Sequence, residues 1–254
     1  MEGKVDVIGE SMLVIPAIDI RGGNCVRLVQ GKLEQETIFS KDPVFVAKLW
    51  QAQGAKKLHI VDLDGAFSGV IQNLELIVKI AKSINVPVEV GGGIRDMDTI
   101  KRVLSGGVAE VILGTSAIYD TDTVKKALKK FGDKIVISID STGGKVAIGG
   151  WKEITAVRSM ALAKRVKEMG VKKIIFTDIK KDGMLKGPNV KGIKAFAEKV
   201  KVSVIACGGI STLDDVKRIK ELEQSGVTGM IIGKALYTGD IKLQEAIEIA
   251  EKRG

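Results

Sequence analysis

The sequence has few of the residues that build metal centres, disulfide frameworks and membrane spans. It contains two cysteines, with no CxxC spacing, and one histidine among 254 residues. We therefore expect neither a disulfide framework nor a zinc site, and no other metal. No apolar run approaches the roughly 20 residues that a membrane span needs, and the first residues lack the apolar core of a secretory signal. We expect a soluble, cytoplasmic chain without a membrane partner.

Aromatic residues are also scarce, at 4% of the chain, although lysine and arginine give a formal net charge of +9. A basic surface attracts anions, so charge alone leaves nucleic acid, acidic membranes and phosphorylated metabolites open. Nucleic-acid binding favours clustered basic residues with aromatics for stacking. Here many lysines follow the polar faces of expected helices, as in "TVKKALKKFGDK" at 123–134. We therefore expect no nucleic-acid partner and favour a phosphorylated small molecule.

Short runs rich in valine and isoleucine alternate with amphipathic segments of helical periodicity. Such runs, apolar on both faces, are typical of a parallel sheet covered by helices. Eight units in about 250 residues predict a closed (β/α)8 TIM barrel, although a doubly wound open sheet would show the same local pattern. The expected strands lie at 12–20, 57–64, 86–93, 110–115, 134–140, 172–179, 202–209 and 229–236, with helices including 44–55, 73–84, 121–133, 161–170 and 242–253.

An internal repeat favours the barrel. The segment from Gly91 to Ala117 has a near copy from Cys207 to Leu236, a shift of 116 positions (207 − 91), and the stretch from Ala17 resembles that from Ser138 at a shift of 121 (138 − 17). Two half-barrels, at about 12–133 and 134–254, account for both shifts. We expect a single barrel domain over 12–254, preceded by an extension of unknown role at 1–11.

Four aspartates end apolar strands, at the barrel face where active sites lie. Asp19, Asp62, Asp140 and Asp178 occupy these positions. A carboxylate closing an apolar strand is costly unless it is solvated or used. Asp19 and Asp140 are the stronger site candidates, while Asp62 and Asp178 fit equally well as caps of the following loop or helix.

Glycine pairs follow the third and seventh expected strands, at Gly92–Gly93 and Gly208–Gly209. Glycine lets the backbone approach a ligand closely, and the N-terminus of a following helix attracts anions. Gly114 and Gly233 likewise follow apolar strands, the fourth and the eighth. The pattern predicts two phosphate sites on opposite sides of the barrel mouth. Ser211 and Asp214 predict a capping box beside the second site.

The segments "VIPAIDIRGGNCVRLVQG", "LHIVDLDGAF", "VEVGGGIR", "TDIKKDGMLKGPN", "GGISTLDDVK" and "GMIIGKALY" resemble the histidine-biosynthesis isomerases that act on phosphoribosyl-formimino-AICAR ribotide. The resemblance runs from about Met12 to the C-terminus. It implies a (β/α)8 barrel of two similar halves, a reaction without cofactor or metal, and a substrate with a phosphate at each end. We expect the chain to be a monomer. The implied reaction is an Amadori rearrangement of an aminoaldose to an aminoketose by acid–base catalysis.

The resemblance also implies roles for individual residues. Asp19 matches the base and Asp140 the acid, with Asp178 as a rival for the acid, and Arg27 matches a substrate-contacting arginine. His59, in "LHIVD", is expected as an inward-facing barrel side chain. The expected substrate-binding set is completed by Gly92, Gly93, Gly114, Thr115, Thr177, Gly208, Gly209, Gly233 and Lys234.

Two departures from the family pattern affect the loop after Asp140, which should help to hold the centre of the substrate. Thr142 stands where the family usually has an arginine, and Gly149 where it often has a basic residue. These departures argue against full activity and against the bifunctional behaviour of relatives that also isomerise phosphoribosyl-anthranilate, which is kept as one alternative. A second is the related cyclase barrel, whose first strand usually ends in Cys-Leu-Asp, whereas Ala17 precedes Ile18 and Asp19 here.

Overall fold

Eight parallel strands close into a barrel in the computed structural model of the chain, which describes residues 11–252. Their order around the ring is β1, β4, β5, β6, β7, β10, β11 and β12, and pairing of β7 with β10 closes it. The predicted (β/α)8 barrel is confirmed, because an open sheet would leave these two strands unpaired. The barrel strands are β1 (Leu13–Arg21), β4 (Leu58–Asp62), β5 (Val88–Gly91), β6 (Glu110–Leu113), β7 (Ile135–Thr142), β10 (Lys173–Asp178), β11 (Ser203–Cys207) and β12 (Val227–Ile232).

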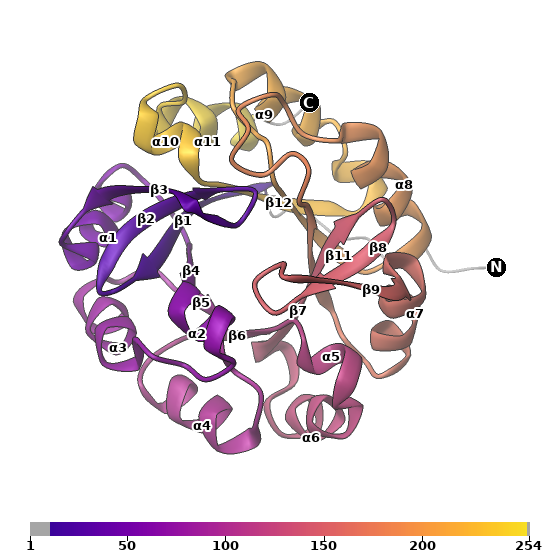
Figure 1. The fold of residues 1–254 in the computed structure, drawn as a ribbon. Coiled ribbons are helices and arrows are strands. Elements are labelled where there is room, and N and C mark those ends of the chain that lie inside the picture. The colour runs from indigo at the N-terminus through magenta and orange to yellow at the C-terminus, as the bar shows by residue number, and fades with distance from the viewer. Residues whose placement is uncertain (1–10, 253–254) are drawn as a thin grey trace.

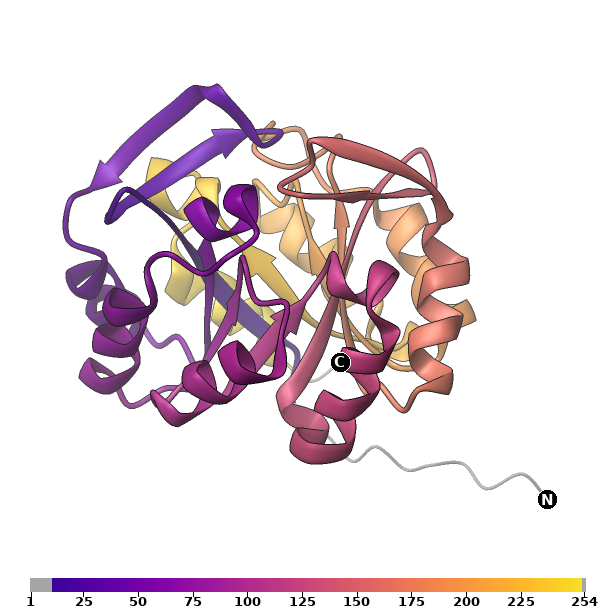
Figure 2. The ribbon, with the colours of Figure 1, turned by 60° about the horizontal axis from the view of Figure 1, so that its bottom comes forward.

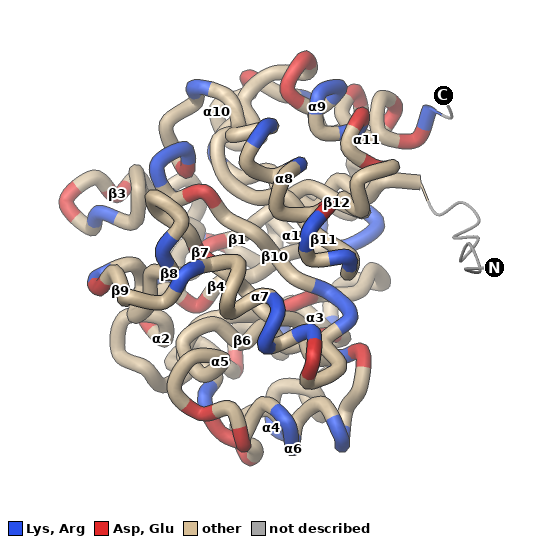
Figure 3. The backbone as a smooth tube through the Cα atoms, turned by 90° about the vertical axis from the view of Figure 1, so that its right-hand side faces the viewer, with Lys and Arg blue, Asp and Glu red and all other residues tan. Residues whose placement is uncertain are grey.

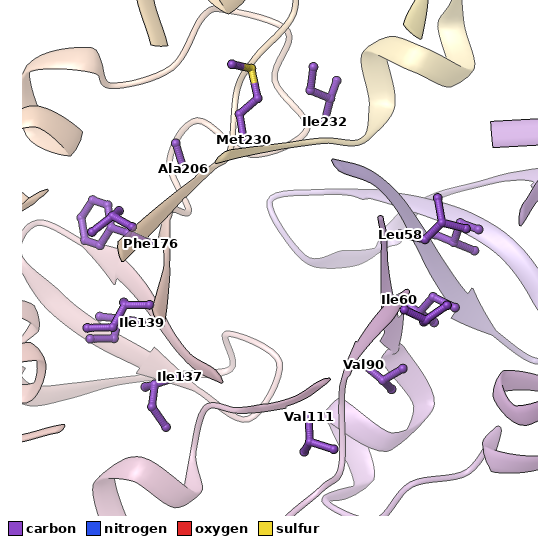
Figure 4. Packing of buried hydrophobic residues seen from close by; sticks show 14 of the residues in the cluster. Leu58, Ile60, Val90, Val111, Ile137, Ile139, Phe176, Ala206, Met230 and Ile232 are labelled. Atoms are coloured by element: carbon purple, nitrogen blue, oxygen red, sulfur yellow. The ribbon is translucent and has the colours of Figure 1, made fainter. Parts of the chain in front are cut away.

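The barrel strands are buried on both faces, which explains their nearly continuous apolar sequences. In β1, Ile18 and Ile20 belong to the cluster beneath the helices, whereas Ile15 and Ala17 belong to a second cluster inside the barrel. Figure 4 shows the outer set, including Ile60, Val111 and Phe176, pointing away from the barrel axis. The inner cluster consists of Ile15, Ala17, Ile112, Val136, Ile175, Ile205 and Ile231.

Helices surround the barrel on the outside (Figure 1). Several begin at a side chain that caps the first turn: Asp42, Asp96 and Asp120 each accept a hydrogen bond from a backbone N–H two or three residues later. The helices are α1 (Pro43–Ala52), α2 (Leu63–Ser68), α3 (Leu74–Ser83), α4 (Met97–Ser105), α5 (Ser116–Tyr119), α6 (Thr121–Phe131), α7 (Ser159–Glu168), α8 (Val190–Val200), α9 (Leu213–Lys220), α10 (Lys234–Thr238) and α11 (Leu243–Glu251).

The capping box of α9 is shifted by one residue from its predicted position. Thr212 is the N-cap, and its side chain accepts from the N–H of Asp215, whose carboxylate accepts from the N–H of Thr212. Ser211 instead donates its hydroxyl to the same Asp215 carboxylate. The predicted pair of Ser211 and Asp214 is therefore wrong, because the sequence offers two overlapping hydroxyl–carboxylate spacings.

Two antiparallel hairpins extend from the barrel, and sequence analysis did not predict them. β2 (Asn24–Val29) and β3 (Lys32–Ser40) follow β1, and β8 (Lys145–Ile148) and β9 (Glu153–Arg158) follow β7. The turns that open them contain Gly22–Gly23 and Gly143–Gly144, all four with positive φ, as two-residue hairpin turns require. Figure 2 shows both hairpins at the same end of the barrel.

Lysine and arginine lie on several outer helices, including α6, α7 and α8, with acidic residues between them (Figure 3). None of the helices within residues 11–252 is both long enough and apolar enough to cross a membrane. The predicted extension, residues 1–11, lies outside the described residues except for its last residue.

The inner cluster yields a stability prediction. Ile205 is 2% exposed inside the barrel, so Ile205→Ala should lower the free energy of unfolding by about 2–5 kcal/mol through lost burial and a residual cavity. Ile38, 52% exposed on β3, provides the control. Ile38→Ala should change the free energy of unfolding by no more than about 0.5 kcal/mol. Urea unfolding followed by circular dichroism measures both. Equal losses would contradict a packed barrel interior.

Candidate active site

A cavity opens at the C-terminal ends of the barrel strands, between the two hairpins. All but one of the predicted site residues line it. These are Asp19, Arg27, Gly92, Gly93, Gly114, Thr115, Asp140, Thr177, Gly208, Gly209, Gly233 and Lys234. The exception is Asp178.

Asp19 lies at the end of β1 and forms an ion pair with Arg27 on β2, with 2.6 Å between Oδ2 and Nη1. Arg27 also donates to the Ala17 carbonyl and stacks over the Tyr237 ring, 4.9 Å from its centroid. Burial alone would lower the pKa of Arg27, but the Asp19 carboxylate raises it above its usual value. Arg27 therefore stays a cation and holds the Asp19 carboxylate in place.

Asp140 lies on β7, on the opposite side of the ring from Asp19. Its carboxylate accepts hydrogen bonds from Ser138 Oγ at 2.9 Å and from Trp151 Nε1 at 2.8 Å. Trp151 adopts a positive φ of 68° in the turn between β8 and β9. Its indole also contacts the other hairpin, because a Cβ placed on Gly31 would lie 2.7 Å from Trp151 Cε3.

A third carboxylate of the cavity, Asp182, was missed by sequence analysis. It lies in the loop after β10. Burial, together with the nearby charges of Asp19 and Asp140, raises the pKa of Asp182 from 3.8 to about 7, although the Arg27 cation acts in the opposite direction. Only its place in "TDIKKDG", beyond the end of an apolar strand, marks it in the sequence.

Asp62 and Asp178 hold loops rather than line the cavity. Asp62 is fully buried and accepts from the N–H groups of Gly65, Gln72 and Asn73, and from Asn73 Nδ2.

Asp178 accepts from the N–H of Lys180 and from Asn189 Nδ2. Asn73 and Asn189 are related by the same 116-residue shift as the two aspartates (189 − 73 = 178 − 62). Of the two roles that the sequence allowed for Asp178, a site residue or a residue that holds its own loop, the structure shows the second.

The glycine loops flank the cavity on opposite sides of the ring. One set, on β5 and β6, contributes Gly92, Gly93 and Gly114, and the other, on β11 and β12, contributes Gly208, Gly209 and Gly233. Gly208 must be glycine: its φ is 96°, and a Cβ there would lie 2.9 Å from the Asp178 carbonyl oxygen. Arg95 and Lys234 add a cationic side chain on either side. The arrangement suits an anion at each end of a long ligand.

The described residues contain no group of three histidine, cysteine, aspartate or glutamate side chains placed to hold a metal ion. Cys207 lines the cavity, and burial raises the pKa of its thiol well above the usual value. The residues that carry charge in the cavity are therefore the carboxylates, Arg27, Arg95 and Lys234.

A sequence profile of the family described as "Histidine biosynthesis protein" matches residues 13–242. The chain belongs to the histidine biosynthesis protein family. The matched region spans every barrel strand and both sets of glycine loops.

Close relatives of this histidine biosynthesis family member share one name, 1-(5-phosphoribosyl)-5-((5-phosphoribosylamino)methylideneamino)imidazole-4-carboxamide isomerase. The relative from Pelotomaculum thermopropionicum is 49% identical over 239 residues, covering 94% of this chain and 92% of its own length. That from Syntrophus aciditrophicus is 50% identical over 240 residues, covering 94% and 99%. That from Acetivibrio thermocellus is 48% identical over 240 residues, covering 94% and 100%.

The contacts of Asp62 predict a structural phenotype for Asp62→Asn. An asparagine amide has one acceptor oxygen and would turn its NH₂ toward donors that now face a carboxylate, leaving buried N–H groups unpaired. We expect the free energy of unfolding to fall by about 2–4 kcal/mol. Urea unfolding without substrate measures it. Wild-type stability combined with lost activity would instead assign Asp62 a chemical role.

Proposed function

We propose that this chain isomerises the bis-phosphorylated imidazole carboxamide ribotide named in its relatives, converting its aminoaldose to an aminoketose. The observation that carries the proposal is the crossed arrangement of the cavity. Two glycine loops lie opposite each other at β5–β6 and β11–β12, while Asp19 and Asp140 lie opposite each other at β1 and β7. A substrate with a phosphate at each end would span the first pair and place its middle between the second.

The reaction needs an acid for the ring oxygen of the ribose and a base for the proton on its C2. We assign the base to Asp19, which lines the cavity opposite Asp140 and is held in place by its 2.6 Å ion pair with Arg27. Protonation of the ring oxygen opens the ribose to an iminium, and removal of the C2 proton then gives an enolamine. Its tautomerisation yields the aminoketose, so electrons balance without an external oxidant.

We assign the acid to Asp182. Its pKa of about 7 keeps a substantial fraction protonated near neutral pH, as a general acid requires. Asp140 then acts through its charge, which raises the pKa of Asp182, and through its hydrogen bond to Trp151. The sequence-based assignment of the acid to Asp140 stays a prediction, and variants of the two residues separate the two assignments.

The pH dependence of kcat/KM distinguishes the two acids. A general acid works only while protonated, so activity should fall as pH rises through about 7. Asp182→Asn should lower kcat by about 100-fold or more. Asp140→Asn removes a charge that raises the pKa of Asp182, so the alkaline fall should move to lower pH while measurable turnover remains.

Asp214→Asn, on the exposed side of α9, is the matched control and should leave the profile unchanged. Our acid assignment is wrong if Asp140→Asn abolishes turnover while Asp182→Asn retains it. Circular dichroism spectra of all three variants check that they are folded.

Turnover tests the proposed function directly. Purified chain mixed with the formimino ribotide should form the aminoketose, followed by coupling to cyclase and ammonia. A parallel assay with phosphoribosyl-anthranilate tests whether the chain is a bifunctional isomerase. An assay of cyclisation by this chain alone tests whether it is the cyclase. Folded protein without activity on the formimino ribotide would refute the proposal, and comparable kcat/KM on both ribotides would establish a bifunctional enzyme.

The proposal includes a monomeric cytoplasmic enzyme without cofactor. The cavity is built within one chain, and its lining residues supply both proton-transfer groups and both phosphate sites. Light scattering coupled to gel filtration measures the mass of the particle.

A further inference from the structure

His59, on β4, lies at the floor of the cavity and takes no part in the mechanism above. Its register neighbour on β1 is Ala17, one inward position below Asp19. The side chain is 11% exposed, and Nδ1 lies 2.8 Å from Glu89 Oε1 on β5. No described residue forms a hydrogen bond with Nε2, and this atom is not among the buried atoms that lack a partner. The Nε2 edge of the ring is therefore the one that the cavity can reach.

Glu89 is fully buried inside the barrel, between His59 and Lys57. Burial alone would raise the pKa of Glu89, but the hydrogen bond from His59 and the ammonium group of Lys57 hold it below its usual value. Glu89 is thus a carboxylate and can only accept hydrogen bonds. Its contact with His59 requires a proton on Nδ1.

The charges beneath His59 balance without a proton on its second nitrogen. Lys57 Nζ lies 2.6 Å from both Glu89 and Glu110, and Lys173 Nζ lies 2.8 Å from Glu110. Two ammonium groups thus match two carboxylates. Buried charges are tolerated when they are paired in this way, and the pairing here is complete without a contribution from His59.

His59, Glu89, Lys57, Glu110 and Lys173 form a connected series, here called the polar line, in one part of the barrel. Other inward positions are filled by isoleucine and valine, such as Ile15, Val136 and Ile205. Apolar side chains therefore suffice to fill the barrel, and a structural role alone does not require the two buried charges of Lys57 and Glu89 beneath the cavity floor.

We infer that Glu89 is a positioning residue that holds His59 as the Nδ1–H tautomer, so that Nε2 presents a hydrogen-bond acceptor to a hydroxyl group of the sugar bound above it. Lys57 holds Glu89 in turn. The inference deepens the proposed function and rests on it for the identity of the sugar, whereas the tautomer is a property of the free protein.

The single histidine makes the tautomer directly measurable. Protein labelled with ¹⁵N-histidine, with any purification tag removed, has one imidazole whose two nitrogen shifts report which nitrogen carries the proton. At pH 8 we expect Nδ1 protonated and Nε2 unprotonated in the wild type. A protonated Nε2 with a bare Nδ1 in the wild type overturns the inference, whatever happens to any variant.

Variants of Glu89 then test its control over the ring. Glu89→Leu should give a mixture of His59 tautomers and a kcat/KM on the formimino ribotide about tenfold lower than that of the wild type. Glu89→Gln keeps an acceptor oxygen, so it should retain more of the Nδ1–H tautomer and more of kcat/KM than Glu89→Leu does. Lys173→Gln removes the ion pair at the far end of the polar line and leaves the contact between Glu89 and His59 intact. It should change neither the tautomer of His59 nor kcat/KM. An unaltered tautomer in Glu89→Leu contradicts the inference.

Substitutions of His59 test the acceptor itself. A glutamine amide reaches the position of Nε2, whereas an asparagine amide reaches only that of Nδ1, so His59→Gln should retain more kcat/KM than His59→Asn. Equal losses contradict the acceptor role. If the wild type shows no turnover, the proposed function fails, and the nitrogen shifts still decide whether Glu89 sets the tautomer.

Discussion

The pairing of β7 with β10 closes the sheet, and the placement of every group in the cavity depends on it. In a closed ring of eight strands, positions four strands apart face each other. Asp19 on β1 therefore faces Asp140 on β7, and the glycine loops of β5–β6 face those of β11–β12. An open sheet carrying the same residues would place these pairs along an edge, too far apart to act on one molecule.

Crowding of charge then sets the chemistry inside the cavity. Asp19, Asp140 and Asp182 share one space with Arg27 and Lys234. Arg27 forms an ion pair with Asp19 alone among the three, while partial burial and the negative charges of the other two raise the pKa of Asp182. The position of one cation thus gives chemically identical side chains different surroundings within one cavity.

Much of this arrangement can be predicted from sequence because it depends on local patterns. Apolar runs give the strands, and an aspartate or glycine that ends a run marks the catalytic face. What the pattern cannot decide is whether a strand-ending aspartate turns into the cavity or into its own loop. Asp62 and Asp178 turn away because Asn73 and Asn189, ten or more residues later, return to donate to them. Asp182 cannot be recognised from the sequence, because its raised pKa comes from burial and from charges on residues distant in sequence. The hairpins could have been predicted, since Gly22–Gly23 and Gly143–Gly144 are two-residue turn signals.

The contact between Gly31 and Trp151 links two hairpins that belong to different halves of the chain. The two hairpins meet beside the cavity, which Gly31 and Trp151 both line. The same indole donates to the Asp140 carboxylate, so a glycine in the first half of the chain and a carboxylate in the second contact one side chain. A side chain larger than hydrogen at position 31 would collide with the indole, and the shift of Trp151 needed to relieve the collision would disturb its hydrogen bond to Asp140.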